Sequence, residues 1–463
     1  MVTLAEQLKK QAEAIEELQA RLAKDSSNSG KPPSSDGYKK KNSEKRTESQ
    51  RKKGQKPNGG QQGHKGHTLE MSSEPDKTAF HSVHKACQYC ESSLEEVLVS
   101  DHEERQVFDI PSMRIEVTAH KVEIKICSQC GKKNQASYPE HVKNAVQYGS
   151  GIKTWASYLS VQHFIPTART AQIIEDLFSH RISEQTVIKS CQQLSMKIQP
   201  AIEAIKTQLQ QANIVHFDES GVRVKGKLHW IHSASTAYLT HYHIDEKRGQ
   251  IAIDKAGILP ELKGIACHDH WKPYFKYDVQ HALCNAHHLR ELSYLEKQYK
   301  QEFSPEMKEL LTTINQEKQE KIESEVSQFS KQEIKAYENS YDKIVAKGQK
   351  INPKKPRKAK SKKRGATKQT PAYNMLRRLH DYKKEVLAFM YDFQVPFTNN
   401  QAEQDVRMIK VKQKISGCFR TFDGAGEFAQ NRAYISTSRK NNENVFQSIK
   451  RAFENNPFIP QFE

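Results

Sequence analysis

The sequence has no long hydrophobic run. A helix that spans a bilayer needs about 18 or more consecutive apolar residues, and no such stretch occurs among the 463 residues. From Met1 onward the chain is charged and helix-prone, without the apolar core of a secretory signal. We therefore expect neither a membrane span nor export. A chain of this length favours about three domains.

Acidic residues are scarce relative to basic ones. Lys and Arg total 73 against 55 Asp and Glu, which gives a formal net charge of +18. Such an excess favours a polyanionic partner, most often a nucleic acid. Because many soluble proteins carry a basic excess, the charge alone does not identify the partner.

Cysteine is used sparingly, and half of the eight cysteines form two Cys-x-x-Cys pairs. The pairs are Cys87 with Cys90 and Cys127 with Cys130, with 36 residues between them. Each pair can chelate an ion from a tight turn, and two pairs complete a tetrahedral site of four sulfurs that suits structural Zn²⁺. A redox-active dithiol is the competing interpretation, and the presence of two matched pairs disfavours it.

The segment around these cysteines predicts a zinc-ribbon-like module over residues 71–145. Its apolar and β-branched residues favour strands at 105–110 and 115–126. The gap between the two pairs is longer than the common spacing of about 15–20 residues.

Two segments of unlike character precede this module. Residues 1–24 predict a helix that either forms a short coiled coil, and with it an oligomer, or packs on its own domain. Residues 25–70 form a basic low-complexity linker whose cations either follow a phosphate backbone or stay solvated. The a and d positions of the first segment are Leu4, Leu8, Ile15, Leu18 and Leu22.

Residues 146–211 are helical in pattern. Ser183 is placed to cap a helix that opens at Glu184. Two short helices followed by a capped third are typical of a helix-turn-helix domain that binds DNA, and equally of a plain helical bundle.

The pattern changes to alternating strands and helices at residue 212. In order we expect three strands, a helix, two strands and a helix, which is the order of an RNase H-like α/β core. The expected strands are 214–220, 227–235, 238–244, 264–271 and 281–284, and the expected helices are 249–258 and 286–295.

The core continues after an interruption. Residues 212–300 form its first part, 301–394 a helical basic insertion, and 395–463 the part that closes it. Within the insertion, residues 343–368 hold twelve Lys or Arg and no acid. That window predicts an exposed, flexible loop that either clamps DNA or is simply solvated.

Three carboxylates stand where they can converge on a metal pair. Asp218 and Asp269 follow apolar strands, and Glu403 lies in a helix far along the chain. Oxygen ligands of this kind suit Mg²⁺, which in pairs supports phosphoryl transfer. Asp218 and Glu219 point to opposite faces of their strand, and the sequence does not say which of them faces the site.

The helix that carries Glu403 has a distinctive surface. Thr398, Asn399 and Asn400 are of the type that caps a helix start, and Ala402, Val406 and Ile409 form an inward face. Arg407, Lys410 and Lys414 follow Glu403 at helical spacing, and Arg420 lies in the basic turn beyond. We expect these four cations to contact DNA phosphates.

Several motifs together resemble the transposases of the insertion sequence 66 family, a bacterial DDE-type group, over nearly the whole chain. They are SNSGKPPSSD and GGQQGHKGH near the start, HFDES at 216–220, CHDHWKPY at 267–274, LCNAHHLREL at 283–292, PFTNNQAE at 396–403 and KISGCFR at 414–420. Many members carry Asp where this chain has Thr398.

The resemblance implies that Asp218, Asp269 and Glu403 are the catalytic triad, served by Mg²⁺ or Mn²⁺. Hydrolysis at the element's ends would free a 3′-OH that then attacks target DNA. A family Cys-x-x-His element is matched by Cys284 and His287, with buried packing and metal binding both open.

The implied partners are the terminal inverted repeats, target DNA, further copies of the chain in a synaptic complex, and accessory proteins of the same element. The implied location is cytoplasmic, at the bacterial nucleoid. Two alternatives remain: a non-catalytic zinc-containing DNA-binding protein, and a nuclease with the same metal site.

Overall fold

The computed structural model describes residues 4–24, 69–356 and 367–461. The linker expected at 25–70 lies almost wholly outside the described residues, as do two of the N-terminal motifs and the middle of the basic window. The chain divides into two units, one of residues 41–115 and one of residues 1–40 with 116–463. None of the helices that the structure describes combines the length and the apolar character that crossing a bilayer requires.

In the described part of unit 41–115 the backbone is extended and irregular. Cys87 and Cys90 lie in a tight turn, in which the Glu91 N–H donates to the Cys87 carbonyl at 2.9 Å. The strand expected at 105–110 is wrong, because the structure gives these residues no strand pairing. Val107 is 90% exposed there, and an alternating segment with no surface to pack against gains nothing from strand formation.

The second Cys-x-x-Cys pair lies in the other unit, between two short antiparallel strands, β1 (Ile124–Ile126) and β2 (Lys133–Gln135). The expected strand at 115–126 is therefore correct only at its end. The turn closes as the Cys127 N–H donates to the Lys132 carbonyl at 2.9 Å. Gly131 adopts φ +67° there, a conformation that glycine reaches without a steric penalty.

The helical prediction for 146–211 is confirmed. The Ser183 hydroxyl accepts from the Thr186 N–H at 3.1 Å and caps its helix as expected. Ile174, Ile182 and Val187 form part of a separate small core between the first helices. The elements are α2 (Ser150–Ser157), the π-helix η2 (Tyr158–Gln162), α3 (Thr167–Phe178), α4 (Glu184–Lys197) and α5 (Gln199–Gln211).

A five-stranded mixed sheet follows, in the order β5-β4-β3-β6-β7. β3 pairs antiparallel with β4, and β4 with β5, whereas β3, β6 and β7 run parallel. All five expected strands are present, and β3 extends four residues further because Val222 and Val224 are also buried. The strands are β3 (Ile214–Val224), β4 (Lys227–Ser235), β5 (Thr240–Asp245), β6 (Ile265–His268) and β7 (Gln280–Leu283).

Helices join and extend the sheet. α6 (Gln250–Ala256) and the 3₁₀ turn η3 (Leu259–Glu261) connect β5 to β6, and η4 (Lys272–Lys276) connects β6 to β7. After α7 (Asn285–Tyr299) come α8 (Phe303–Glu323), α9 (Lys331–Ile351), α10 (Pro371–Asp381), α11 (Lys383–Val386) and α12 (Ala388–Tyr391). These helices share one core, which continues onto Cys267 and Leu283 of the sheet.

The basic window is not a loop throughout. Residues 343–351 belong to α9, and 357–366 lie outside the described residues. Ser330 and Glu333 form a reciprocal capping box at the start of α9, and Tyr341 and Val345 are buried along it. The prediction of a loop was wrong for residues 343–351, because it rested on charge and did not consider the buried face of the helix.

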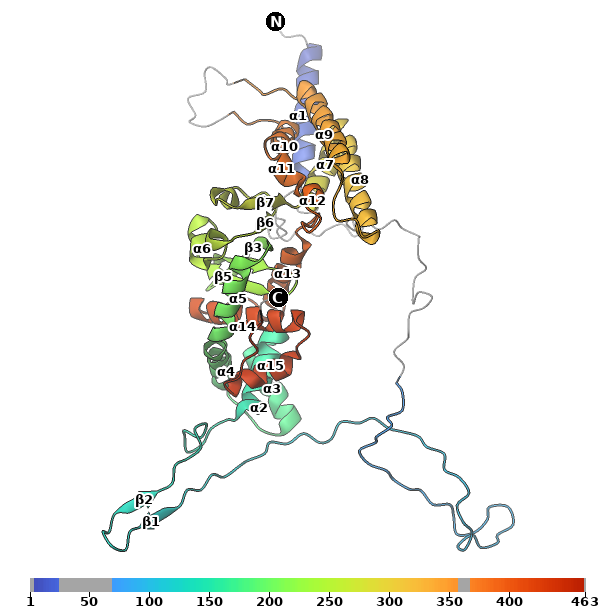
Figure 1. Ribbon diagram of the computed structural model, residues 1–463, viewed down its shortest axis with the longest axis vertical. Helices are drawn as coiled ribbons and strands as arrows, with labels where there is room; N and C mark the ends of the chain where they lie inside the picture. Colours follow the sequence, from blue (N-terminus) through green and yellow to red (C-terminus); the bar gives the residue numbers. More distant parts are fainter. Residues whose placement is uncertain (1–3, 25–68, 357–366, 462–463) are drawn as a thin grey trace. The chain divides into compact units, whose positions relative to one another are not determined.

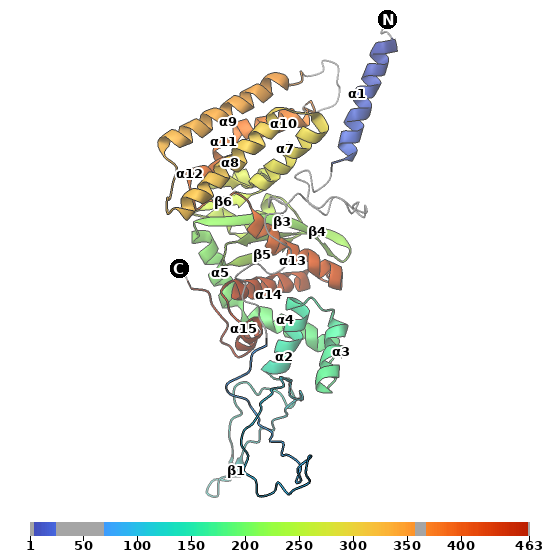
Figure 2. The same cartoon turned by 90° about the vertical axis from the view of Figure 1, so that its right-hand side faces the viewer.

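Three helices complete the chain: α13 (Asn400–Ser416), α14 (Phe422–Lys440) and α15 (Val445–Phe453). Figures 1 and 2 show α13 and α14 beside the strands β3, β4 and β5. The inward face of α13 is confirmed, since Ala402, Val406 and Ile409 are each at most 6% exposed.

The N-terminal helix is also present as α1 (Leu4–Leu22). The Tyr294 hydroxyl donates to its Ala20 carbonyl at 2.6 Å. Leu8, Ile15 and Leu18, however, are each more than half exposed. Most of the heptad seam therefore has no packing partner within the described unit, and the coiled coil stays a prediction.

Acidification should destabilise the β4–β5 pair. His232 on β4 is 7% exposed, and burial lowers its pKa to about 4, against the opposing effects of a Lys247 hydrogen bond and the Asp245 charge. Since the unfolded pKa is about 6.5, the unfolded chain takes up the proton first. The stability is then present above about pH 6.5 and is lost as pH falls toward about 4.

Thermal unfolding measured from neutral pH down to about pH 5 should therefore show a smaller loss of Tm in His232→Gln than in wild type. The exposed His84→Gln is the control and should follow wild type. An unchanged acid sensitivity in His232→Gln would contradict the assignment.

Candidate active site

Asp218 and Asp269 lie at the same level of two neighbouring parallel strands. The register pairs Ile214 with Ile265 and His216 with Cys267, so Asp218, two residues on, falls opposite Asp269 just past the end of β6. Adjacent strands are about 4.8 Å apart, and both side chains leave on the same face because side chains alternate. The sheet thus brings the two aspartates together.

Glu403 lies in the first turn of α13 and faces two basic side chains of α7. Its Oε1 is 3.3 Å from His287 Nε2 and 3.5 Å from Arg290 Nη2. Burial alone would raise the pKa of Glu403, but the hydrogen bond and charge of His287, with Arg290 and Arg407, lower it below the ordinary value. Glu403 is therefore held as a carboxylate.

The three carboxylates share one electrostatic field. Burial, followed by the charges of Glu219, Asp269 and Glu403, raises the pKa of Asp218 well above its ordinary value. Burial and Glu219 raise the pKa of Asp269 to about 6, against the opposing effect of His287. Clustered carboxylates with raised pKa values lack compensating positive charge, and a divalent cation supplies such charge.

The three carboxylates do not form a complete set of metal ligands in this structure. Within residues 4–24, 69–356 and 367–461, no three His, Cys, Asp or Glu side chains lie close enough to hold one ion. Asp218 Oδ1 accepts from the Glu219 N–H at 2.8 Å, and Asp269 Oδ1 accepts from the Trp271 N–H at 3.1 Å. These backbone contacts orient each aspartate and leave its second oxygen for a ligand.

Glu219, unlike its neighbour Asp218, is bound to other side chains inside the protein. Glu219 is 5% exposed, and its Oε2 accepts from the Tyr274 hydroxyl at 2.6 Å. Its Oε1 accepts from Arg248 Nε at 3.0 Å. Glu219 is therefore engaged inside the protein, and Asp218 is the carboxylate available beside the end of β6.

Arg248 itself lies over two indole rings. Its guanidinium carbon lies 4.8 Å from the centre of the Trp230 ring and 4.5 Å from that of Trp271. Cation–π contact with both rings fixes the cation that holds Glu219. Sequence reasoning did not identify Arg248, Trp230 or Tyr274 as supports of the site, although Trp271 and Tyr274 fall within one of the motifs that carry the family resemblance.

The start of α13 is anchored differently from expectation. Asn399 occupies the capping position, but its side chain does not bond to the helix backbone. Its Nδ2 donates to the Phe217 carbonyl at 2.7 Å, and its Oδ1 accepts from His216 Nδ1 at 2.8 Å. The Asn399 N–H reaches Cys284 Sγ at 3.1 Å. Asn399 thus joins α13 to β3 next to Asp218.

The same contacts give roles to the Cys-x-x-His element. Cys284 is 1% exposed, and burial raises the pKa of its thiol to about 11, so it acts as a buried acceptor for Asn399. His287, one turn into α7, contacts Glu403. The pair therefore positions the helix and its carboxylate, which favours packing over metal binding.

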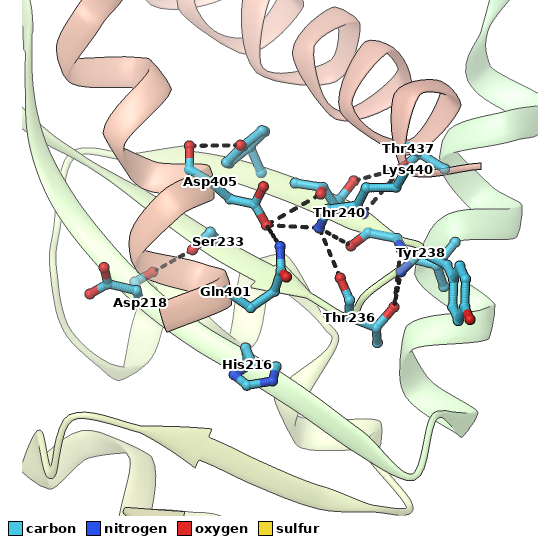
Figure 3. Close-up of polar contacts among 12 residues, drawn as sticks. His216, Asp218, Ser233, Thr236, Tyr238, Thr240, Gln401, Asp405, Thr437 and Lys440 are labelled. Atoms are coloured by element: carbon cyan, nitrogen blue, oxygen red, sulfur yellow. Dashed lines mark hydrogen bonds and ion pairs between the residues drawn. The ribbon is translucent and has the colours of Figure 1, made fainter. Parts of the chain in front are cut away.

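A second anchor fixes the rotation of α13 (Figure 3). Asp405 Oδ2 accepts from Lys440 Nζ at 2.9 Å and from Gln401 Nε2 at 3.3 Å. Lys440 of α14 also donates to the carbonyls of Thr236 and Leu239 at 2.8 and 3.0 Å. Two residues along a helix turn through about 200°, so seating Asp405 in this network directs Glu403 to the other side.

The four predicted DNA-binding cations differ in exposure. Arg407, Lys414 and Arg420 are exposed. Lys410 is half-buried, donates to the Gly221 carbonyl at 2.5 Å, and has its pKa lowered by burial. Lys410 thus supports the packing of α13 on β3, and its predicted phosphate contact stays a prediction.

Removing the second anchor should destabilise the protein. Asp405→Ala leaves the largely buried ammonium of Lys440 with carbonyl acceptors alone, and breaking a buried pair in this way costs about 3 kcal/mol. Urea unfolding measures the loss. Glu306→Ala is the control. Glu306 pairs with Lys347 at the surface, where the two side chains are 40% and 45% exposed respectively, and such a pair contributes less than about 1 kcal/mol. Equal losses in the two variants would contradict an anchoring role.

Comparison with known proteins assigns the chain to a family. Residues 145–427 match the model of a family described as "Transposase IS66 family". Residues 1–70 match a family of unknown function, DUF6444. No curated protein matches the chain. The first match spans Asp218, Asp269 and Glu403 and every structural element between them.

Proposed function

The chain belongs to the IS66 family of transposases, and from this premise we propose that it cleaves and joins DNA at Asp218, Asp269 and Glu403 by metal-dependent phosphoryl transfer. Family membership implies a function in transposition. The observation that carries the chemistry is geometric: the register of β3 and β6 sets Asp218 opposite Asp269, and Asn399 joins the start of the helix that carries Glu403 to β3 beside Asp218. A nuclease with the same site would cleave DNA without joining it.

We also propose that the mixed sheet belongs to an RNase H-like core. Three antiparallel strands lead into two parallel ones, with β3 in the middle of the sheet. Carboxylates follow at β3, after β6 and on a late helix, as that fold would need. We propose 212–300 and 395–463 as the two parts of the core, with 301–394 as the insertion and 146–211 as a DNA-binding domain.

The donor set fits a divalent cation of the Mg²⁺ or Mn²⁺ class. Asp218, Asp269 and Glu403 offer only oxygen atoms, and Mg²⁺ needs few protein ligands because it keeps several waters. A bound cation would supply the positive charge that activates the attacking oxygen and stabilises the leaving oxygen. His287 and Arg290 hold Glu403 ionised, and the Trp271 N–H orients Asp269.

The substrates we propose are the terminal repeats of the element and a target duplex. Water would first attack a phosphodiester at the element's end and release a 3′-OH. That hydroxyl would then attack a target phosphodiester, forming one bond as another breaks. We propose that more than one copy of the chain holds the two ends together, with accessory proteins of the element as further partners.

Neutralising each carboxylate should abolish strand transfer while preserving DNA binding. Asp218→Asn, Asp269→Asn and Glu403→Gln keep the side-chain volume and remove the charge that a cation needs. Joining of labelled element ends to plasmid DNA with Mn²⁺ measures the loss, which should exceed about 10³-fold.

The exposed Glu261→Gln is the matched control and should join normally. Full joining by any of the three variants would remove that residue from the site. Cleavage without a joined product in wild type would favour a nuclease, and no cleavage at all would favour a non-catalytic DNA-binding protein.

We further propose a structural Zn²⁺ on Cys87, Cys90, Cys127 and Cys130. Hydrogen bonding with Ser92 lowers the pKa of Cys90, and the Cys130 and Gln129 backbone lowers that of Cys127, which favours the thiolate that Zn²⁺ requires.

Elemental analysis of the purified full chain should find zinc that Cys87→Ser and Cys130→Ser both lose. Cys418, another exposed cysteine, provides the control, and Cys418→Ser should keep the metal. Zinc content that survives both pair variants would refute the site.

A further inference from the structure

α13 runs beside β3 in the same direction. At one end Asn399 bonds to Phe217. In the middle Lys410 bonds to the Gly221 carbonyl. At the far end the Phe419 N–H donates to the Arg223 carbonyl at 2.9 Å, and Phe419 pairs with Val224. The helix and the basic turn after it therefore follow β3 from the carboxylates to the β3–β4 hairpin.

Exposed cations follow the same course. Residues 221–229 and 406–422, which form the hairpin and the helix beside it, hold eight Lys or Arg and no Asp or Glu. Lys410 and Lys412 are directed inward, to carbonyls of the backbone. The remaining six are exposed, and we call them the basic path: Arg223, Lys225, Lys227, Arg407, Lys414 and Arg420.

Two of these cations, Lys225 and Lys227, lie at the tip of the hairpin. Val224 pairs with Lys227, so the loop is the two residues Lys225 and Gly226, both with positive φ, +49° and +76°. This is the geometry of a type I′ turn, in which Asn or Gly is the usual first residue. A lysine there costs about 1 kcal/mol in backbone strain, so the turn carries a cation in spite of an unfavourable backbone conformation.

We propose that the basic path binds the phosphate backbone of duplex DNA that extends from the reacting phosphate toward the hairpin. Lys225, the first residue after β3, lies seven residues beyond Asp218, or about 23 Å at 3.3 Å per residue. That length corresponds to about seven base pairs of duplex. DNA binding by the path needs no chemistry at the carboxylates, and only the position of the reacting phosphate rests on the proposed function.

Salt-dependent binding tests the path. Without divalent cations, fluorescence anisotropy of the full chain on a labelled duplex of arbitrary sequence and about 30 base pairs gives the affinity between about 50 and 200 mM KCl. Each lost phosphate contact lowers the slope of log K against log salt by about 0.9 and weakens binding nearly tenfold near 0.1 M. Lys225→Ala/Lys227→Ala should thus lower the slope by nearly two.

Two control variants test whether the position and the charge of these lysines matter. Lys263→Ala/Lys331→Ala removes the same charge at exposed positions outside the path and should bind like wild type, as should Lys225→Arg/Lys227→Arg. A slope unchanged in Lys225→Ala/Lys227→Ala, or lowered equally in Lys263→Ala/Lys331→Ala, would overturn the proposal.

A second experiment tests the distance along the DNA between the reacting phosphate and the hairpin lysines. In the joining assay, ends that extend fewer than about seven base pairs from the reacting phosphate should be used equally well by wild type and Lys225→Ala/Lys227→Ala. A difference that persists on such short ends would refute the placement. Failure of joining in wild type would instead contradict the proposed function and leave the anisotropy result standing.

Discussion

The hydrogen bonds of Asn399 are the constraint on which the site depends. Glu403 is separated from Asp218 by 184 residues that include the helices α7 to α12. Asn399 closes that distance, since its side chain bonds to Phe217 and His216, directly before Asp218. Because Asn399 is 1% exposed, these bonds form away from competing water and fix the start of α13 against the strand.

The helices between β7 and α13 take part in the site. α7 packs with α8–α12 in a core that reaches β6 and β7, and the same helix carries His287 and Arg290 against Glu403. Lys318 of α8 adds a further link, as its Nζ donates to the Val395 carbonyl at 2.7 Å just before α13 begins. Helices far from the carboxylates in sequence thus determine how one of them is held.

Sequence patterns predicted the strands and helices of the core because burial there follows regular periods. The strand predictions for 214–220 and 227–235 are confirmed since their apolar alternation matches the sheet faces. The prediction for 105–110 is wrong because alternation there meets no packing surface. The capping role of Asn399 was mistaken, as a local motif cannot reveal a tertiary partner in β3. The contact of Arg248 with two indole rings was missed for the same reason.

The carboxylates of the site differ in whether a basic side chain contacts them. Arg248 compensates Glu219, and His287 with Arg290 compensates Glu403, but Asp218 and Asp269 have no cation within hydrogen-bond reach among the described residues. Burial and the charge of Glu219 disfavour ionisation of Asp218 and Asp269, and this pair of carboxylates raises the free energy of the folded chain. A fold retains such a pair when something that binds there recovers that free energy. This imbalance at Asp218 and Asp269, more than the number of acids, supports our proposal that a cation and a phosphate meet at the end of β6.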